Sequence, residues 1–411
     1  MLLVLACAAP EPELPDGESD PSDPVDEAVE AIGDAETRPD PDDPSFLFAD
    51  TGIVVLELEL DEAALAALAT DPLSYVPGAL AHRAGSGVVE RYGPIGVRLK
   101  GNSTYQWIDG KPALKLKFDE YTPGERFHGL ERLTLDSNYW DGAQMAETLA
   151  YRMWRASDSP AARTGYATVS LNGEPLGLYT IVEAMDDGLM DQWWPGSNGG
   201  LYEMGRSCDF TLDCSCYELQ DTGENFDASG LTRACAAAAS GDEAAIRATW
   251  DWDRLVRYQA LELGLNHPDS YTFNRNNYYI HHDPLTDRVT LLPWGADSTF
   301  SYAYPPDEDR PCQPGYFDAF VMSRAGGVSA WCAASPTCWA DVKVELLALA
   351  DRIEAEDLAG FAAATAARID DAVLAEPRWP WGYDTFVEQS TCFQDWIAAR
   401  PEQIRAYVEA H

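Results

Sequence analysis

The spacing of the apolar residues changes about half-way along the chain, and this change limits the folds available to it. In the first half, apolar and polar residues alternate, as at 53–60 and 114–118, which is typical of strands with one buried face. A hairpin is indicated where Asn172-Gly173 joins residues 167–171 to 176–183. Helical spacing dominates from residue 228 onward. We therefore predict an α+β domain with a β-rich N-terminal lobe at 46–187, an α-rich C-terminal lobe at 188–411, and a cleft between them.

Shorter signals predict individual elements. Asp61 precedes an alanine-rich segment and is expected to begin a helix at 61–70. An amphipathic helix is expected at 141–156. The turn-like DPLTD should join two strands at 278–281 and 288–292. The last helix, at 393–411, is expected to break at Pro401.

The segment before residue 46 looks like a leader and a tether. Residues 1–7 end a short apolar run at Cys7, which is typical of a lipoprotein signal and predicts a lipid anchor on that cysteine. Residues 8–45 are rich in proline and acids, with Arg38 as their only basic residue, which predicts a disordered linker. No later apolar run approaches the length that a transmembrane helix needs.

The cysteine count supports an oxidising compartment. If Cys7 carries lipid, eight cysteines remain, and an even number fits disulfides outside the cytoplasm. We expect a local cluster of bridges between Cys208 and Cys235, and a short loop from Cys332 to Cys338. Free buried thiols in a cytosolic protein are the alternative.

The charge balance excludes one class of partner. The chain of 411 residues has 28 basic and 69 acidic side chains, for a formal net charge of −41. Such a surface repels phosphate backbones, so a nucleic-acid partner is not expected.

Residues 266–300 combine acids and carboxamides around the predicted hairpin. Asp269, Asn274, Asn277 and Asp297 offer oxygen atoms, which suit Mg²⁺ or Mn²⁺ better than Zn²⁺. The spacing from Asp269 to Asn274 matches a kinase catalytic loop, in which the acid accepts a hydroxyl proton and the amide binds metal. Asp297 would then join the metal to the phosphates. The simpler interpretation is that these residues only form turns.

Three upstream groups could serve the same chemistry. Residues 98–104, RLKGNST, hold a glycine and small polar side chains that can direct backbone N–H groups toward an anion, which makes Lys100, Asn102 and Ser103 candidate cofactor-binding residues. Lys115 and Lys117 share one face of a strand and could meet phosphate. Glu147 could hold a strand lysine in position. A β-turn, a solvated strand face and a surface glutamate explain these groups equally well one at a time.

Taken in order, these segments resemble the CotH family of secreted or coat-associated atypical kinases. The resemblance covers residues 46–411 and rests on RLKGNS at 98, LKLKF at 114, ETLAY at 147, NGEPLGLY at 172 with Val182-Glu183, GLY at 200, NNYY at 276 and LPW at 292. It implies a two-lobed, protein-kinase-like fold that transfers the ATP γ-phosphate to Ser or Thr of secreted or surface proteins, using Mg²⁺ or Mn²⁺.

The resemblance also implies roles for single residues. Lys117 or Lys115 would be the ATP lysine, with Glu147 as its partner. Asp269 would be the catalytic acid, and Asn274 or Asn277 a metal ligand. The strand around Glu183 would be the hinge that meets adenine.

One position departs from the family pattern. The acid that usually follows Pro-Trp is Gly295 here, and Asp297 lies two residues further on. Two residues along an extended chain restore the same side, so Asp297 is expected to take over. If it does not, the chain is a non-catalytic pseudokinase that serves as a coat or envelope scaffold. A third hypothesis, reached without the resemblance, is a metal-dependent hydrolase that uses Asp269 and Asp297 with His267, His281 or His282.

Overall fold

The structure is a computed structural model. It describes residues 43–83, 89–101, 105–197, 199–205, 207–211, 213–223, 225–300, 319–320 and 322–411. The predicted signal and lipid anchor at residues 1–7, nearly all of the predicted linker, and the candidate residues Asn102 and Ser103 lie outside this description.

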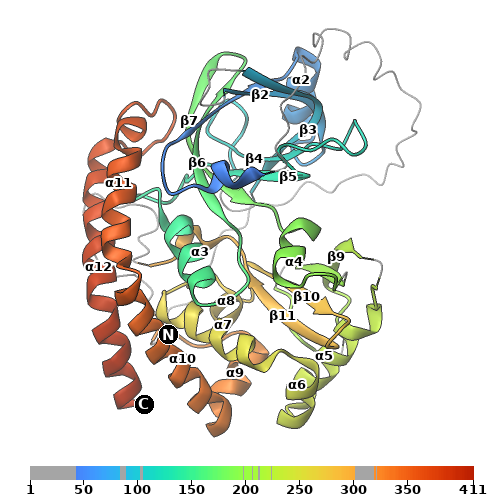
Figure 1. The fold of residues 1–411 in the computed structure, drawn as a ribbon, viewed down its shortest axis with the longest axis vertical. Helices are drawn as coiled ribbons and strands as arrows, with labels where there is room; N and C mark the ends of the chain where they lie inside the picture. The colour runs from blue at the N-terminus through green and yellow to red at the C-terminus, as the bar shows by residue number, and fades with distance from the viewer. Residues whose placement is uncertain are drawn as a thin grey trace. The chain divides into compact units, whose positions relative to one another are not determined.

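A closed barrel forms the first part of the described chain (Figure 1). Its strands follow the order β1-β2-β3-β4-β5-β7-β6, and the parallel pairing of β1 with β6 closes it. The strands are β1 (Val54–Glu59), β2 (Val76–Arg83), β3 (Val89–Lys100), β4 (Ala113–Lys117), β5 (Arg132–Asp136), β6 (Thr164–Leu171) and β7 (Glu174–Glu183). A short 3-10 helix, η1 (Pro44–Phe48), precedes the barrel, and α2 (Glu62–Thr70) lies between β1 and β2.

Strict alternation explains how β4 is oriented. Leu114 and Leu116 are buried in the apolar core of the barrel, whereas Lys115 and Lys117 are half-buried on the other face. The hairpin of β6 and β7 turns at Asn172 and Gly173, which both have positive φ, as the sequence predicts. The side chain of Asp61 caps α2 as expected, by accepting the N–H of Ala64 at 2.7 Å.

Between β5 and β6 the chain forms α3 (Ala146–Ala156), which is mostly buried. The prediction that this helix starts at residue 141 was wrong. The carboxylate of Asp141 instead accepts the N–H groups of Ala143 and Ala146, at 3.0 and 2.7 Å. A side chain that satisfies the first free N–H groups belongs just before a helix, not inside it.

The second part combines a small sheet with helices. The sheet has the strand order β11-β10-β8-β9, and its strands are β8 (Gly200–Met204), β9 (Tyr217–Thr222), β10 (Tyr278–Asp283) and β11 (Arg288–Pro293). The predicted hairpin is β10 and β11. The helices are α4 (Asp187–Trp193), α5 (Ala228–Ser240), α6 (Glu243–Thr249), α7 (Trp252–Gly264), α8 (Tyr271–Asn274), α9 (Gly327–Ala334), α10 (Pro336–Ala355), α11 (Leu358–Leu374) and α12 (Tyr383–Ala410), with a 3-10 turn η2 (Ala296–Ser298) after β11. The expected mixture of a β-rich first part and a helical second part is confirmed.

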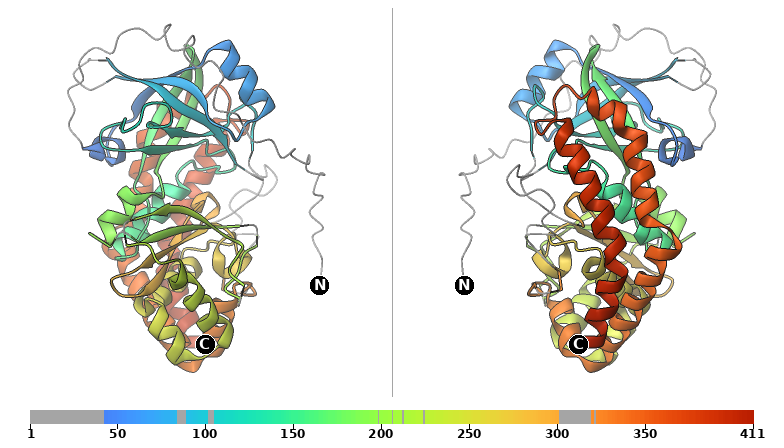
Figure 2. Two further views of the ribbon diagram at one scale, coloured as in Figure 1. Left: turned by 90° about the vertical axis from the view of Figure 1, so that its right-hand side faces the viewer. Right: turned by 90° about the vertical axis from the view of Figure 1, so that its left-hand side faces the viewer.

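The last helix does not break where the sequence predicts. α12 starts ten residues before the predicted start at residue 393 and continues through Pro401. The guanidinium of Arg400 is buried and donates to the carbonyls of Gly264 and Leu263 at the end of α7, at 2.6 and 2.9 Å. α12 also runs alongside α11 (Figure 2). These tertiary contacts outweigh the hydrogen bond that a proline removes.

Disulfides confirm the predicted cysteine clusters. Cys208 pairs with Cys216, Cys214 with Cys235, and Cys332 with Cys338. Bridges of this kind indicate an extracytoplasmic environment. In the part of the chain that the structure describes, no helix has the length and apolar character to span a membrane.

A buried ion pair joins the barrel to the helical part. The ammonium of Lys111, in the loop before β4, lies 2.9 Å from Glu376 Oε2, and both side chains are almost completely excluded from solvent. The same carboxylate oxygen accepts the N–H of Leu178 in β7 at 2.7 Å. Glu376 follows α11, so one carboxyl group holds the turn between the last two helices against the barrel.

Replacing Lys111 should therefore be costly. Lys111→Met leaves a buried carboxylate unpaired and should lower the free energy of unfolding by about 3–5 kcal/mol. The matched control is Arg91→Met, which removes an exposed ion pair with Glu59 and should cost less than about 1 kcal/mol. Urea unfolding followed by circular dichroism measures both. Equal, small losses would show that the buried pair does not stabilise the fold.

Candidate active site

A pocket of about 380 Å³ opens where the barrel meets the second sheet. The barrel contributes charged residues from β3, β4 and β5. The second part contributes the loop after α7, β8, and the turn after β11. The polar lining residues are Arg98, Lys100, Lys115, Asp136, Glu203, Asp269, Asn276, Asn277 and Asp297.

Lys100 is the cation at the base of this pocket. It is the last residue of β3, and its ammonium lies 2.9 Å from Asp136 Oδ2 at the end of β5. The ammonium also lies 5.4 Å from the ring centre of Trp294. Burial alone would lower the pKa of Lys100, but the charges of Asp136 and Glu147 reverse this effect and raise it.

Two further carboxyl groups surround this pair. Burial, together with the charge of Asp136, raises the pKa of Glu147 on α3 well above its usual range, although Lys100 opposes the shift. Burial and the charges of Asp136 and Asp269 raise the pKa of Asp297 to about 8, again against Lys100. Without a further cation, the carboxyl groups of the cluster would carry more negative charge than Lys100 neutralises, so some of them bind protons.

The turn after β11 brings Asp297 to the cluster. The chain at 295–297 is not extended, contrary to prediction, because Gly295 is left-handed (φ 51°, ψ 51°) and opens the 3-10 turn η2. A Cβ atom at Gly295 would lie 2.8 Å from Asn277 Oδ1. A side chain in this conformation would thus meet strain and a collision, so the turn as it stands requires glycine.

Asp269 is held by the amides that follow it. The side-chain amides of Asn274, Asn276 and Asn277 donate to its carboxylate, those of Asn276 and Asn277 at 3.0 and 2.9 Å. Asn277 also donates to the backbone carbonyl of Asp269 at 3.0 Å. Hydrogen bonds to an ionised acceptor are strong, so they fix the orientation of the carboxylate toward the pocket.

A second, smaller pocket of about 210 Å³ adjoins the first. Arg98, Lys115 and Trp294 line both pockets, and Lys117 and Arg132 add two more cations to the smaller one. Its lining also includes Ala184 and Met185, which connect β7 to α4. Burial lowers the pKa of Lys115 to about 8, although Glu203 opposes the shift. In a chain of net charge −41, the cations Arg98 and Lys115, which line both pockets, can attract an anion to the junction of the two.

The structure brings together Lys100, Lys115, Glu147, Asp269, Asn277 and Asp297, but not every predicted site residue. Lys117 lies 2.8 Å from Glu120 rather than beside Glu147. Asn274 is exposed and does not line the larger pocket. Glu183 is buried against Arg163 at 2.6 Å and does not line the smaller pocket, although Ala184 and Met185 directly after it do.

The histidines of the hydrolase hypothesis lie elsewhere. His281 packs against Trp194 with ring centres 4.2 Å apart and the rings tilted, and His282 pairs with Asp287 at 3.0 Å. His267 is buried 3.3 Å from the carbonyl of Gly295, and burial lowers its pKa to about 4. None of these three lines either pocket, so the geometry gives that hypothesis no support.

Sequence reasoning missed several residues of the site. Asp136 was not singled out, although an acid directly after the apolar strand Leu133-Thr-Leu135 is a signal that could have found it. Arg98 and Arg132 were also missed as pocket residues. Their cations converge only because β4 pairs with both β3 and β5.

The donor set fits a hard divalent cation. Asp269, Asn277 and Asp297 all line the larger pocket and carry oxygen atoms, which Mg²⁺ and Mn²⁺ prefer. The excess of carboxyl groups over ammonium groups supplies the attraction. These residues would hold such an ion beside Lys100.

Comparison with known proteins identifies one family. Residues 97–404 match the family described as CotH kinase protein. No curated protein matches the chain. A solved structure from Shewanella oneidensis MR-1, of the toxin–antitoxin system HipA, HipB and its operator DNA, aligns at 13% identity with a TM-score of 0.35. The alignment covers 76% of this chain and 68% of that one.

The conformation of Gly295 can be tested by adding one methyl group. Gly295→Ala should lower the free energy of unfolding by about 2–3 kcal/mol, because the left-handed backbone costs about 1 kcal/mol and the contact with Asn277 adds to it. Gly124→Ala is the matched control, since Gly124 also has positive φ but nothing lies within 4 Å of the added Cβ. Chemical denaturation would contradict this account if the two losses were equal.

Proposed function

The chain belongs to the CotH kinase protein family, and on that premise we propose that it transfers the γ-phosphoryl group of ATP to Ser or Thr side chains of secreted or surface proteins. The observation that carries the proposal is the junction of the two pockets. The cations of the smaller pocket adjoin the carboxyl groups of the larger pocket, and Arg98 and Lys115 line both pockets. A nucleoside triphosphate with its metal ion needs cations beside its phosphates and carboxyl groups beside the metal.

The nucleotide would lie across both pockets. Its base and sugar would occupy the smaller pocket beside Ala184 and Met185, and its phosphates would reach Arg98, Lys115 and Lys100. Lys100 also fits the role of a phosphate-binding lysine, because it lines the larger pocket with its ammonium held 2.9 Å from Asp136, and the charge of Glu147 on α3 helps to raise its pKa. Lys100 and Lys115 are thus better candidates for the phosphate-binding lysines than Lys117.

Asp269 would act on the acceptor hydroxyl. Its carboxylate accepts the proton as the hydroxyl oxygen forms a bond to the γ-phosphorus, while the bond from that phosphorus to the bridging oxygen breaks and ADP leaves. The amides of Asn276 and Asn277 keep the carboxylate in place for this transfer. Mg²⁺ or Mn²⁺ held by Asp297 and Asn277 would neutralise charge on the phosphates.

The proposed location follows from the disulfides and the N-terminal sequence. The bridges at Cys208–Cys216 and Cys332–Cys338 suit an oxidising compartment. We propose that Cys7 carries a lipid anchor, that the acidic segment after it acts as a tether, and that the substrates are proteins of the envelope or the surroundings. The net charge of −41 argues against a nucleic-acid substrate.

Removing the catalytic or the metal-binding acid should abolish transfer. We expect Asp269→Asn and Asp297→Asn each to reduce ATP-dependent phosphate incorporation with Mn²⁺ by at least about 100-fold. Incorporation from γ-labelled ATP into the chain and into added protein measures this. Asp253→Asn, at an exposed position of α7, should retain full incorporation.

The pseudokinase alternative has a distinct outcome in the same assay. A wild-type chain that incorporates no phosphate and does not bind ATP in a calorimetric titration with Mn²⁺ would be a scaffold, with Gly295 as the reason. Wild-type incorporation in Asp297→Asn would instead remove Asp297 from the site.

Replacing Lys115 and replacing Lys117 should change the KM for ATP to different extents. Lys115→Met should raise the KM for ATP about tenfold or more, because it removes a charged donor where the pockets join. Lys117→Met should change it less than about twofold, since the Lys117 ammonium is paired with Glu120 and faces solvent more. Steady-state kinetics with varied ATP would contradict this assignment if the order of the two effects were reversed.

A further inference from the structure

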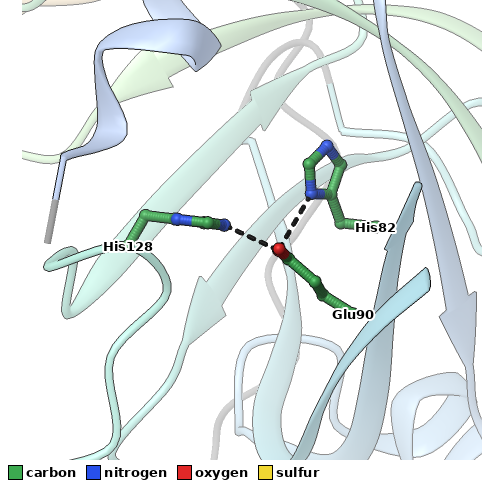
Figure 3. Close-up of side chains that lie close together, drawn as sticks. All are labelled: His82, Glu90 and His128. Atoms are coloured by element: carbon green, nitrogen blue, oxygen red, sulfur yellow. Dashed lines mark hydrogen bonds and ion pairs between the residues drawn. The ribbon is translucent and has the colours of Figure 1, made fainter. Parts of the chain in front are cut away.

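Two histidines and a glutamate meet inside the first part of the fold, away from both pockets (Figure 3). His82 is the penultimate residue of β2, Glu90 lies directly opposite it on β3, and His128 comes from the turn before β5. Only 5%, 7% and 5% of their surfaces are exposed. Three polar side chains from separate segments are thus withdrawn from water together, and the proposed kinase reaction uses none of them.

The donor atoms of these side chains converge on one point. Glu90 Oε2 lies 3.3 Å from His82 Nδ1 and 2.8 Å from His128 Nε2, and all three donor atoms lie within 4.8 Å of one another. Ligands of a tetrahedral zinc ion, each about 2.0–2.2 Å from the metal, are about 3.3 Å apart. The cluster therefore needs little rearrangement to hold an ion at its centre.

The backbone at His128 is shaped to deliver its ring. His128 has a φ of 47°, and with Gly129 it forms a tight turn in which Phe127 and Leu130 exchange backbone hydrogen bonds. Left-handed residues other than glycine are uncommon, and such an outlier on a buried polar side chain points to a specific use of that side chain.

Aromatic rings close the cluster. Phe46 of η1 stacks on His82 with ring centres 5.0 Å apart and meets His128 edge-on at 4.8 Å. Tyr92 Oη lies 3.4 Å from both Glu90 Oε2 and His128 Nε2. Because the three side chains are buried and line neither pocket, an ion held here would stabilise the fold rather than meet a substrate.

We propose that His82, Glu90 and His128 bind a zinc ion that has a structural role, fastening η1 and the turn before β5 to the β2–β3 hairpin. Two imidazole nitrogens and one carboxylate oxygen are a zinc donor set, and a water molecule beside Tyr92 would complete the tetrahedron. This site is separate from the Mg²⁺ or Mn²⁺ site proposed for the kinase reaction, which contains only oxygen donors.

Zinc retention tests the proposal directly. The full chain, freed of any histidine tag, is stripped with chelator, dialysed against trace Zn²⁺ and analysed by mass spectrometry of its metals. We expect one zinc per chain, and a melting temperature several degrees higher with zinc than without.

His128→Asn and Glu90→Gln should lose most of the zinc and the thermal shift. Asparagine tolerates the left-handed turn, so the first variant tests the ligand and not the backbone. His411→Asn, at the exposed C-terminus, is the matched control and should behave as wild type.

The surroundings of the bound ion provide a second measurement. X-ray absorption of the zinc-loaded wild type should show scattering from two imidazole rings. Zinc bound by oxygen atoms alone would place it in the acidic pocket and overturn the proposal. A folded wild type that keeps no zinc and gains no thermal stability would do the same, and would leave the three side chains as a hydrogen-bonded cluster.

Discussion

The ammonium group of Lys100 interacts with carboxyl groups from three separate elements of the fold. Asp136 ends a barrel strand, Glu147 lies on the buried helix α3, and Asp297 follows the second sheet. Burying this much negative charge is costly, and the raised pKa values of Glu147 and Asp297 record that cost. A divalent cation with a nucleotide would relieve the same imbalance. The excess of carboxyl charge where the barrel meets the second part would therefore also attract the metal ion of the proposed reaction.

Local patterns predicted much of the fold because their causes are local. The alternation at 114–118 predicted both β4 and the lysines on its outer face, and Asn172-Gly173 predicted the hairpin turn. The order of polar residues between 266 and 300 was enough to predict that Asp269, Asn277 and Asp297 share one pocket. It did not predict how Asp297 arrives there. That depends on the left-handed backbone of Gly295, which the polar pattern around it does not indicate.

What the sequence did not predict depends on contacts between distant segments. Asp136 meets Lys100 only because β3, β4 and β5 are neighbours in the barrel. The chain continues as helix through Pro401 because α12 packs on other helices, which overrides local preference. The cluster of His82, Glu90 and His128 likewise appears only once the register of β2 against β3 is known. In each case the spacing along the chain carries no trace of the contact.

Binding of Mn²⁺ in the presence of ADP tests the central claim most directly, because it shows whether a cation neutralises the excess negative charge of the carboxyl groups. Electron paramagnetic resonance of free Mn²⁺ measures the binding. The wild type should take up the ion, and Asp297→Asn should weaken this uptake by at least about tenfold. His128→Asn, which alters only the proposed zinc cluster, should match the wild type. Equal Mn²⁺ affinity in Asp297→Asn and the wild type, or no uptake by either, would contradict the claim.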